Sequence, residues 1–262
     1  MRRIAVTGLA LISAISFSFP DFVSGAFAGT PATQTSNFSA DQTRDIEKIV
    51  HDYLVAHPEV IVEAMRALDE KQASEEKARQ ENVIAENRKA IYDDPDSFVA
   101  GNPNGNVTIV EFFDYQCGYC KRSFEPLMDT LRKDGNVRLV LKEFPILGPE
   151  SLSATHAAIA AKRQGKYFEF HQAMFRHKGG LTDAKIMEIA ASVGIDTAKL
   201  RKDMADPAIE KQIERNYDLA RALEIKGTPG FIIGDKVTAG ALDGAEFAAE
   251  VTDARAHCGA SC

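Results

Sequence analysis

The segment at residues 108–122, TIVEFFDYQCGYCKR, constrains the fold more than any other part of this chain. Residues 107–113 carry large apolar side chains at both alternating sets of positions, which predicts a strand covered on both faces. The strand continues through a short polar turn into the motif CGYC at 117–120, and the residues after the motif place their apolar side chains on one face of a helix. A Cys-x-x-Cys motif between a strand and a helix is typical of proteins that exchange thiols and disulfides.

The two cysteines of this motif are predicted to have different roles. At a helix start, two intervening residues bring both sulfurs within bonding reach, with Cys117 exposed and Cys120 a turn further inward. Unpaired backbone N–H groups and the helix dipole favour a thiolate at the first position, so Cys117 is the predicted nucleophile and Cys120 the resolving thiol. The residues between them are Gly118 and Tyr119. Because neither is histidine, no imidazolium within the motif stabilises the thiolate, which predicts a weaker oxidant than a Cys-Pro-His-Cys enzyme.

The alternative interpretation of Cys117 and Cys120 is a structural disulfide or half of a zinc site. A zinc site would need the second pair, Cys258 and Cys262, but three intervening residues at the end of a chain match a rigid zinc ribbon poorly. For this second pair we expect a structural disulfide, with soft-metal binding together with His257 as the alternative. We therefore expect no metal, and no cofactor apart from the redox-active disulfide.

Glu111 is a carboxylate within an otherwise apolar strand. It lies on the same side of the strand as Ile109 and Phe113, where burial would raise its pKa. A carboxyl with a raised pKa is suited to relaying the proton of Cys120. The alternative, which the sequence leaves open, is a buried acid paired structurally with Lys142 of the neighbouring strand.

Thr228 and Pro229 lie in a glycine-flanked turn directly before a predicted strand. A proline at this position is a candidate for a cis peptide bond, and an ordinary trans turn proline is the alternative. Beside the cysteine pair, the extended backbone of Thr228 could hydrogen-bond a substrate chain while that chain is disulfide-linked. We therefore regard both residues as candidate substrate-binding positions.

The rest of the pattern predicts an α/β domain at 94–262. A second buried strand is expected at 137–144, a hairpin at 231–239 and a last helix at 243–256. The long segment between the second strand and the hairpin, about 146–226, is interpreted as almost entirely helical. This order of elements predicts a mixed sheet with helices on both faces and one helical insertion.

The start of the chain has the features of a secretory signal peptide at residues 1–28: two arginines, an apolar run and an A-x-A sequence before the predicted cleavage site. The mature protein is therefore expected in the periplasm, without membrane insertion, with a disordered segment at 29–40. Export favours a redox interpretation of the cysteines, because disulfides persist in an oxidising compartment. With a net charge of −7 and no basic patch, the chain is not expected to bind nucleic acid.

Residues 41–93 are predicted to form an N-terminal helical segment. Two short helices meet at His57-Pro58, share one apolar stripe and precede a helical linker rich in Glu and Lys. The stripe needs a partner, because two short helices are not stable alone in water. It could pack on the body of the same molecule, but the charged linker favours self-association through residues 41–70 into a homo-oligomer.

Together these motifs resemble the DsbA-like thioredoxin-fold oxidoreductases of the bacterial periplasm. The resemblance rests on the strand–CGYC–helix segment, on FPILGPES at 144–151, on the helical insertion and on GTP before the hairpin. The N-terminal pattern EKIV, DYL and HPEVIVEAM is most similar to the ScsC and Com1-like branch. The resemblance implies a thioredoxin fold and a trimer formed by the N-terminal helices. It also implies Cys117 as nucleophile, Cys120 as its partner, Pro229 as cis-proline and Glu111 as the acidic residue beneath the pair.

We therefore predict a periplasmic thiol–disulfide oxidoreductase that acts on cysteine-containing exported proteins and has a membrane redox partner. Isomerase or shuffler activity is favoured for two reasons. CGYC is also the motif of periplasmic isomerases such as DsbC, and several thioredoxin domains around a shared cleft would suit misfolded substrates. A DsbA-type dithiol oxidase is the first alternative. Copper or zinc binding through the four thiols is an alternative of a different class.

Overall fold

The structure is a computed structural model, and it describes residues 38–257. The predicted signal peptide at 1–28 lies outside the described residues, as does most of the predicted disordered segment at 29–40. The chain divides into two compact units, Met1–Glu63 and Ala64–Cys262. Within the described part of the chain, no helix is long and apolar enough to cross a membrane.

In the first unit, α1 (Ala40–Ala56) starts at a capping box, in which the side chains of Ser39 and Gln42 each accept the other's backbone N–H. The helix ends at His57 because a proline follows, and α2 (Glu59–Glu86) begins after that proline. No side chain of α1 is buried, so the apolar stripe predicted from the sequence lies on the surface of this unit. The exposed large apolar residues of α1 are Ile46, Ile49, Val50, Tyr53 and Val55.

The second unit is built on a five-stranded sheet with the strand order β1-β3-β2-β4-β5. β2 pairs with β3 in parallel, and the other neighbouring pairs are antiparallel. The predicted mixed sheet is confirmed, with one strand more than the sequence pattern indicated. That strand, β1, has four residues, as β4 and β5 do, but no hairpin turn marks it in the sequence, because its partner β3 lies far along the chain. The strands are β1 (Phe98–Gly101), β2 (Val107–Phe113), β3 (Val137–Glu143), β4 (Gly230–Ile233) and β5 (Lys236–Ala239).

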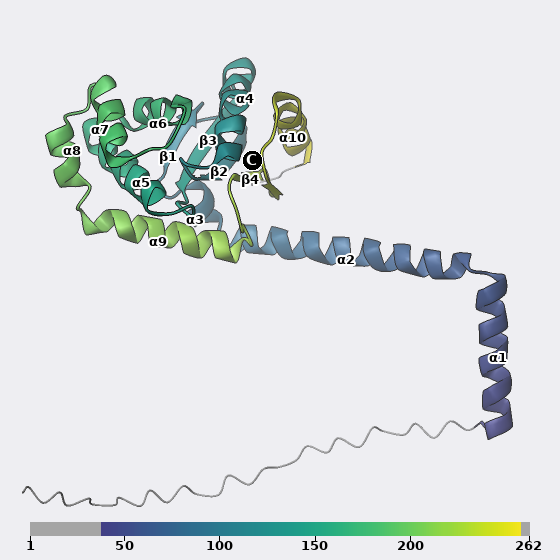
Figure 1. Cartoon of the computed structure of the whole chain (residues 1–262). Coiled ribbons are helices and arrows are strands. Elements are labelled where there is room, and N and C mark those ends of the chain that lie inside the picture. The colour runs from purple at the N-terminus through teal and green to yellow at the C-terminus, as the bar shows by residue number, and fades with distance from the viewer. Residues whose placement is uncertain (1–37, 258–262) are drawn as a thin grey trace, which may run out of the picture. The chain divides into compact units, whose positions relative to one another are not determined.

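Helices cover both faces of this sheet; in the view of Figure 1, α5 to α8 lie to the left and α4 and α10 to the right, and both groups pack on the same face. The predicted insertion between β3 and β4 holds α5 to α9 and a short 3₁₀ helix, η1. Prolines occupy the first turns of α5 and α9, while Thr182 and Asp196 cap α7 and α8. The helices are α3 (Arg88–Tyr92), α4 (Gly118–Asp134), α5 (Pro149–Ala161), η1 (Lys162–Gln164), α6 (Tyr167–Arg176), α7 (Asp183–Ser192), α8 (Thr197–Asp203), α9 (Pro207–Ala222) and α10 (Gly244–His257).

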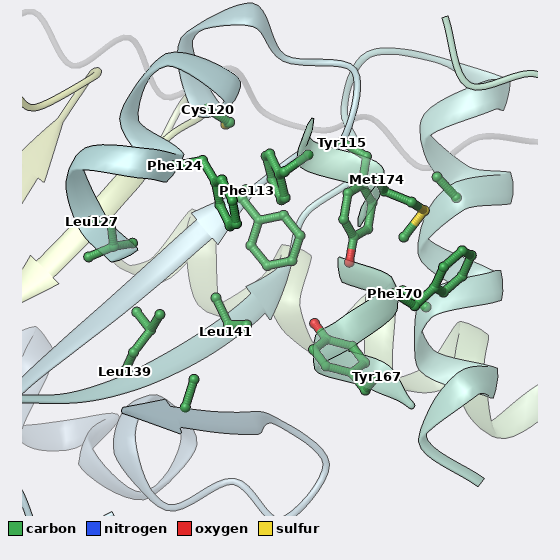
Figure 2. Packing of buried hydrophobic residues seen from close by; sticks show 14 of the residues in the cluster. Phe113, Tyr115, Cys120, Phe124, Leu127, Leu139, Leu141, Tyr167, Phe170 and Met174 are labelled. Carbon is green, nitrogen blue, oxygen red and sulfur yellow. The ribbon is translucent and has the colours of Figure 1, made fainter. Parts of the chain in front are cut away.

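One face of the sheet packs against α4, α10 and the insertion. Val107, Ile109 and Phe113 of β2 point to this face, as the alternation along the strand predicted. Figure 2 shows the ring of Phe113 next to Phe124 of α4, with side chains of α6 further along the same cluster. Phe124 also stacks on Phe175 of α6, with 5.0 Å between the ring centres. This core holds the start of α4, and with it the cysteine motif, against the end of β2.

The opposite face of the sheet carries Phe112 of β2 and packs against α9, α3 and the end of α2. Ile84 of α2 and Ile91 of α3 are both buried there. The last residues of the N-terminal helical segment predicted at 41–93 are therefore part of this second core. The sheet unit reaches further toward the N-terminus than the boundary expected at residue 94. The sequence did not predict this, because Ile84 and Ile91 are isolated apolar residues in a charged segment and gave too weak a signal of packing.

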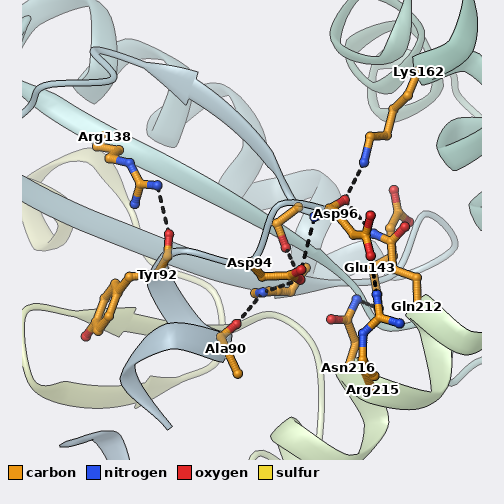
Figure 3. A network of polar contacts seen from close by, with 12 residues as sticks. Ala90, Tyr92, Asp94, Asp96, Arg138, Glu143, Lys162, Gln212, Arg215 and Asn216 are labelled. Carbon is orange, nitrogen blue, oxygen red and sulfur yellow. Dashed lines mark hydrogen bonds and ion pairs between the residues drawn. The ribbon is translucent and has the colours of Figure 1, made fainter.

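Lys142 projects from β3 to this second face, because it pairs in register with Phe112. Its buried side chain donates a 2.6 Å hydrogen bond to the carbonyl of Ala90 and forms a 3.0 Å ion pair with Asp94 (Figure 3). Glu111 points to the opposite face, because neighbouring positions of a strand face opposite sides of the sheet. The alternative in which Lys142 is the structural partner of Glu111 is therefore wrong.

Candidate active site

Cys117 is the N-cap residue of α4, which places its sulfur at the N-terminus of that helix. The sulfur accepts the backbone N–H of Cys120 at 3.4 Å, and the thiol donates to the carbonyl oxygen of Thr228 at 3.2 Å. Hydrogen bonding from the Cys120 side chain is the largest of the effects that lower the pKa of Cys117 to about 5, and burial opposes them. A thiol with this pKa is mostly thiolate at neutral pH, which is the nucleophilic form.

Cys120 is fully buried in the first turn of α4. Burial is the main cause that raises its pKa far above the ordinary value, and the hydrogen bond to Cys117 and the charge of Glu111 act in the same direction. Both cysteines are free thiols in this structure. The sequence predicted the order of the two sulfurs, but Cys117 is itself only 5% exposed, because the backbone at Thr228 lies against it.

Glu111 lies on the same face of the sheet as the cysteine motif, opposite Phe231 of β4. It is 3% exposed, and burial, followed by the charge of Cys117, raises the pKa of its carboxyl to about 8. The charge of Glu111 is in turn among the causes that raise the pKa of Cys120. A carboxyl that is mostly protonated at neutral pH and electrostatically coupled to both thiols is able to take up or release a proton beside them.

The Thr228–Pro229 peptide bond is cis. The carbonyl oxygen of Thr228 accepts the thiol of Cys117, and the carbonyl oxygen of Pro229 accepts the N–H of Gly240 at 2.9 Å. The turn is thereby tied to the sulfur on one side and to the end of β5 on the other. A groove begins at this turn and is lined by Tyr119 and by residues of β5. A chain bound in the groove would lie beside the Cys117 sulfur.

The dipeptide between the two cysteines faces solution. Tyr119 is 59% exposed, and the guanidinium group of Arg122 lies 4.4 Å from the centre of its ring. A Cβ at Gly118 would meet no atom within 4 Å apart from its own chain neighbours and helix backbone, so packing does not require glycine there. The aromatic ring is therefore available for contact with a partner that approaches Cys117.

Asp114, at the end of β2, is a part of the site that sequence reasoning missed. It is fully buried, and its Oδ1 accepts the N–H of Gln116 and the hydroxyl of Ser151, each at 2.7 Å. Its Oδ2 accepts the N–H groups of Ile146 and Leu147 at 2.8 and 2.9 Å. One carboxylate thus ties the turn before the cysteine motif to the segment that leads into α5. The available signal was an aspartate placed directly between a buried strand and the motif.

Within residues 38–257, no group of three or more His, Cys, Asp or Glu side chains is arranged so that it could hold a metal ion. Cys258 and Cys262 lie outside the described residues, and so does the disulfide or soft-metal site expected there. His257 is the last residue of α10. The expectations for the C-terminal pair therefore stay predictions.

Comparison with protein-family models gives two matches. A family described as Thioredoxin matches residues 93–253, and a family described as the copper resistance protein ScsC N-terminal domain matches residues 42–75. The first match covers the sheet and its insertion. The second covers the helices that were predicted to self-associate.

Solved structures similar to this chain include a thioredoxin-like oxidoreductase from Silicibacter pomeroyi and ScsC from Proteus mirabilis. The first is 40% identical, with a TM-score of 0.64, and the match covers 65% of this chain and 99% of that one. The second, in a transitional conformation, is 29% identical, with a TM-score of 0.62, and the match covers 84% of this chain and 98% of that one. The predicted thioredoxin fold is therefore confirmed.

Two kinds of curated relatives share this domain. The thiol:disulfide interchange protein DsbA of Bordetella parapertussis is 31% identical over 150 residues, which are 55% of this chain and 71% of that protein. The Na⁺/H⁺ antiporter NhaA 1 of Salinispora arenicola is 30% identical over 164 residues, which are 62% of this chain and 25% of that protein. The chain therefore spans a quarter of the length of the antiporter, and the match concerns one domain-sized part of it.

Proposed function

Because the chain belongs to the DsbA-like family of thioredoxin-fold proteins, in the branch of ScsC, we propose that it catalyses thiol–disulfide exchange in cysteine-containing exported proteins. The observation that carries this proposal is the opposite pKa shift of two adjacent thiols, down to about 5 for Cys117 and far upward for Cys120. Such a pair offers one thiolate for attack and keeps one thiol in reserve beside it. The reactive group is the cysteine pair itself, without a further cofactor.

Exchange starts from the reduced pair. The thiolate of Cys117 attacks one sulfur of a substrate disulfide, a mixed disulfide forms, and the other substrate sulfur leaves as a thiolate. That thiolate can attack a different disulfide of the same substrate. A substrate thiolate then attacks the mixed disulfide and releases the thiolate of Cys117. The substrate ends with rearranged disulfides and no net transfer of electrons, which is isomerisation.

The same mixed disulfide can instead be resolved by Cys120. Its thiol gives up a proton, for which Glu111 in its ionised form is the proposed acceptor, and its sulfur attacks the sulfur of Cys117. The substrate sulfur leaves as a thiolate. The substrate has then gained two electrons, and the enzyme holds the Cys117–Cys120 disulfide. In the reverse direction, the same steps oxidise a substrate dithiol.

We propose isomerisation as the main outcome, with DsbA-type oxidation as the alternative. The pKa of Cys117, about 5, lies between values of about 3.5 for DsbA and about 7 for thioredoxin, which supports an oxidant of intermediate strength. The exposed stripe of α1 supports a homo-oligomer, and a trimer is the arrangement that the resemblance to ScsC implies. Several sites on one oligomer could hold different parts of one misfolded chain.

The proposed place of action is the periplasm, where a membrane redox partner would reset the cysteine pair. The predicted signal peptide supports this location. A structural disulfide at Cys258 and Cys262 would also persist in that compartment.

Copper or zinc binding is a second candidate function, favoured by the match of residues 42–75 to a family described by copper resistance. It predicts tight stoichiometric metal binding by the reduced protein. If the tail supplies ligands, the binding would disappear in a variant that lacks Cys258 and Cys262. Exchange activity that needs Cys117 while the reduced protein binds no metal would exclude this candidate.

Refolding of a scrambled, fully oxidised protein tests the main proposal. Wild type should restore the native disulfides, and Ile49→Asp, which places a charge on the exposed stripe, should lose this activity while still oxidising a reduced peptide. Lys48→Asp introduces the same side chain at the neighbouring position, which lies outside the apolar stripe, and should keep both activities. If wild type oxidises peptides but cannot repair the scrambled protein, the oxidase alternative replaces isomerisation. If neither reaction depends on Cys117, exchange itself is excluded.

A further inference from the structure

A second buried carboxyl group lies behind the cysteine motif, at the end of β3. Oε1 of Glu143 accepts the hydroxyls of Tyr115 at 3.1 Å and Tyr167 at 2.7 Å, and Oε2 accepts the hydroxyl of Thr155 at 2.9 Å. The hydroxyl of Tyr115 also lies 3.0 Å from Nδ1 of His171. We name these five residues the Glu143 cluster. Each of them is at most 3% exposed, although they come from four separate parts of the chain: β3, α5, α6 and the turn after β2.

One member of the Glu143 cluster belongs to the turn that carries the nucleophile. Tyr115 stands two residues before Cys117, and this turn is closed by a 3.1 Å hydrogen bond from the N–H of Cys117 to the carbonyl oxygen of Asp114. Figure 2 shows the side chain of Tyr115 entering the core, with its hydroxyl group facing that of Tyr167. The turn is therefore attached to the core through Tyr115 as well as through the carboxylate of Asp114.

The hydroxyl of Tyr115 keeps an acceptor in either protonation state of Glu143. Burial raises the pKa of Glu143 to about 8, and burial lowers the pKa of His171 to about 3, so the imidazole is neutral. When Glu143 is ionised, Tyr115 can donate to its Oε1. When Glu143 is protonated, its own proton can be donated to the oxygen of Tyr115, which then donates to Nδ1 of His171 in the tautomer that carries its proton on Nε2. A buried hydroxyl with two alternative acceptors is a stable anchor across the range of neutral pH.

We propose that Tyr115, held by Glu143, is a positioning residue that fixes the Cys117 sulfur against the first N–H groups of α4. The sulfur receives its hydrogen bond from the N–H of Cys120 at 3.4 Å, and the geometry of this bond depends on where the turn holds the sulfur. The alternative is that the Glu143 cluster only completes the core. Both roles would contribute to stability, but only positioning would change the ionisation of Cys117.

The test measures ionisation of Cys117 rather than turnover. The inference rests on Cys117 being the nucleophile of the proposed reaction, but an alkylation rate reports its thiolate whether or not the protein exchanges disulfides. Full-length reduced protein is alkylated with iodoacetamide between pH 4 and 8, and the peptide that contains Cys117 is followed by mass spectrometry. Tyr115→Phe removes one hydroxyl and keeps the ring. Tyr167→Phe is the matched control. The hydroxyl of Tyr167 also donates to Oε1 of Glu143, but Tyr167 belongs to α6 and not to the turn that carries Cys117.

Tyr115→Phe should raise the apparent pKa of Cys117 by about 0.5 to 1, which slows alkylation at pH 5 roughly two- to five-fold and leaves the rate at pH 8 nearly unchanged. Tyr167→Phe should leave the apparent pKa within about 0.2 of wild type. Glu143→Gln keeps an acceptor oxygen and should behave like wild type. Unfolding curves confirm that each variant is folded.

Three results would overturn the proposal. The first is an unchanged Cys117 pKa in folded Tyr115→Phe, and the second is an equal change in Tyr167→Phe. The third is a lowered Cys117 pKa in Glu143→Gln, because the carboxyl would then act through its charge and not as an anchor. If the wild-type protein shows no exchange activity but the alkylation profiles of the variants are as expected, the proposed function is contradicted and the positioning role still stands.

Discussion

The free energy of unfolding of the reduced protein should exceed that of Cys117→Ser by an amount that grows between pH 5 and pH 7. The folded structure lowers the pKa of Cys117 from 9.0 to about 5. Between these values the unfolded chain binds more protons at this site than the folded one, so stability rises with pH. The contribution is complete above the unfolded pKa and is lost as the pH falls through the folded pKa.

The expected size follows from the two pKa values. Each pH unit between them adds about 1.4 kcal/mol, so the difference should grow by roughly 2 to 3 kcal/mol from pH 5 to pH 7. Serine has a similar shape and forms hydrogen bonds but does not ionise in this range, so the comparison isolates the thiolate. The buried carboxyls of Glu111 and Glu143, with pKa values of about 8 in the folded protein, lower stability over the same window, but both are present in wild type and in Cys117→Ser, so their contributions largely cancel in the difference.

Urea unfolding in excess reductant, at several pH values, measures this difference. Cys120→Ser is the control, because the raised pKa of Cys120 keeps that thiol protonated here, and the serine hydroxyl can still donate to Cys117. The free energy of unfolding of Cys120→Ser should still exceed that of Cys117→Ser by an amount that grows with pH almost as much as in wild type. A difference between wild type and Cys117→Ser that stays flat from pH 5 to pH 7 would refute the reasoning, because the folded protein would then hold no thiolate at this position.

Three further changes test other parts of the structure. Glu111→Gln should slow resolution of a mixed disulfide by Cys120 at least ~100-fold if the carboxyl takes the proton; rapid chemical quenching measures this step, and an unchanged rate would exclude the relay. Asp114→Asn should lower the free energy of unfolding by about 2 kcal/mol. Both oxygens of Asp114 accept hydrogen bonds, so the NH₂ group of asparagine would face a buried donor in place of an acceptor. Equal denaturation midpoints for wild type and the variant would contradict this. Lys142→Met should lower the free energy of unfolding by about 2 kcal/mol, because the half-buried carboxylate of Asp94 and the carbonyl of Ala90 both lose their donor. A loss below about 1 kcal/mol would mean that this ion pair adds little.

The sequence predicted those parts of the site that depend on local order. The position of Cys117 at a helix start follows from one strand, one turn and one helix, all within residues 107–134. The side of the sheet on which Glu111 lies follows from the alternation of β2 alone. Thr228 and Pro229 stood out through their flanking glycines, and their place beside the cysteines followed from the resemblance to a known family.

Features that depend on pairing between distant segments were not predictable. The partner of Lys142 is set by the register of β3 against β2, which gives it to Asp94 and Ala90 instead of Glu111. Glu143 is the next residue along the same strand, and its hydroxyl partners come from separate parts of the chain. A single sequence carries no signal of register when both faces of a strand are apolar.

The second core connects the end of α2 to the active site. Ile225 lies three residues before Thr228 and packs in the same cluster as Ile84 of α2. A Cβ at Gly230 would lie 2.6 Å from the Ile225 side chain, so glycine is needed there for Ile225 to reach this core. The segment with the cis peptide bond is therefore held by the sulfur of Cys117 at one end and by a core completed by α2 at the other. Truncation near residue 94 would disturb both the proposed association and the wall of the site, which is why a substitution on α1 of the full chain separates the two effects.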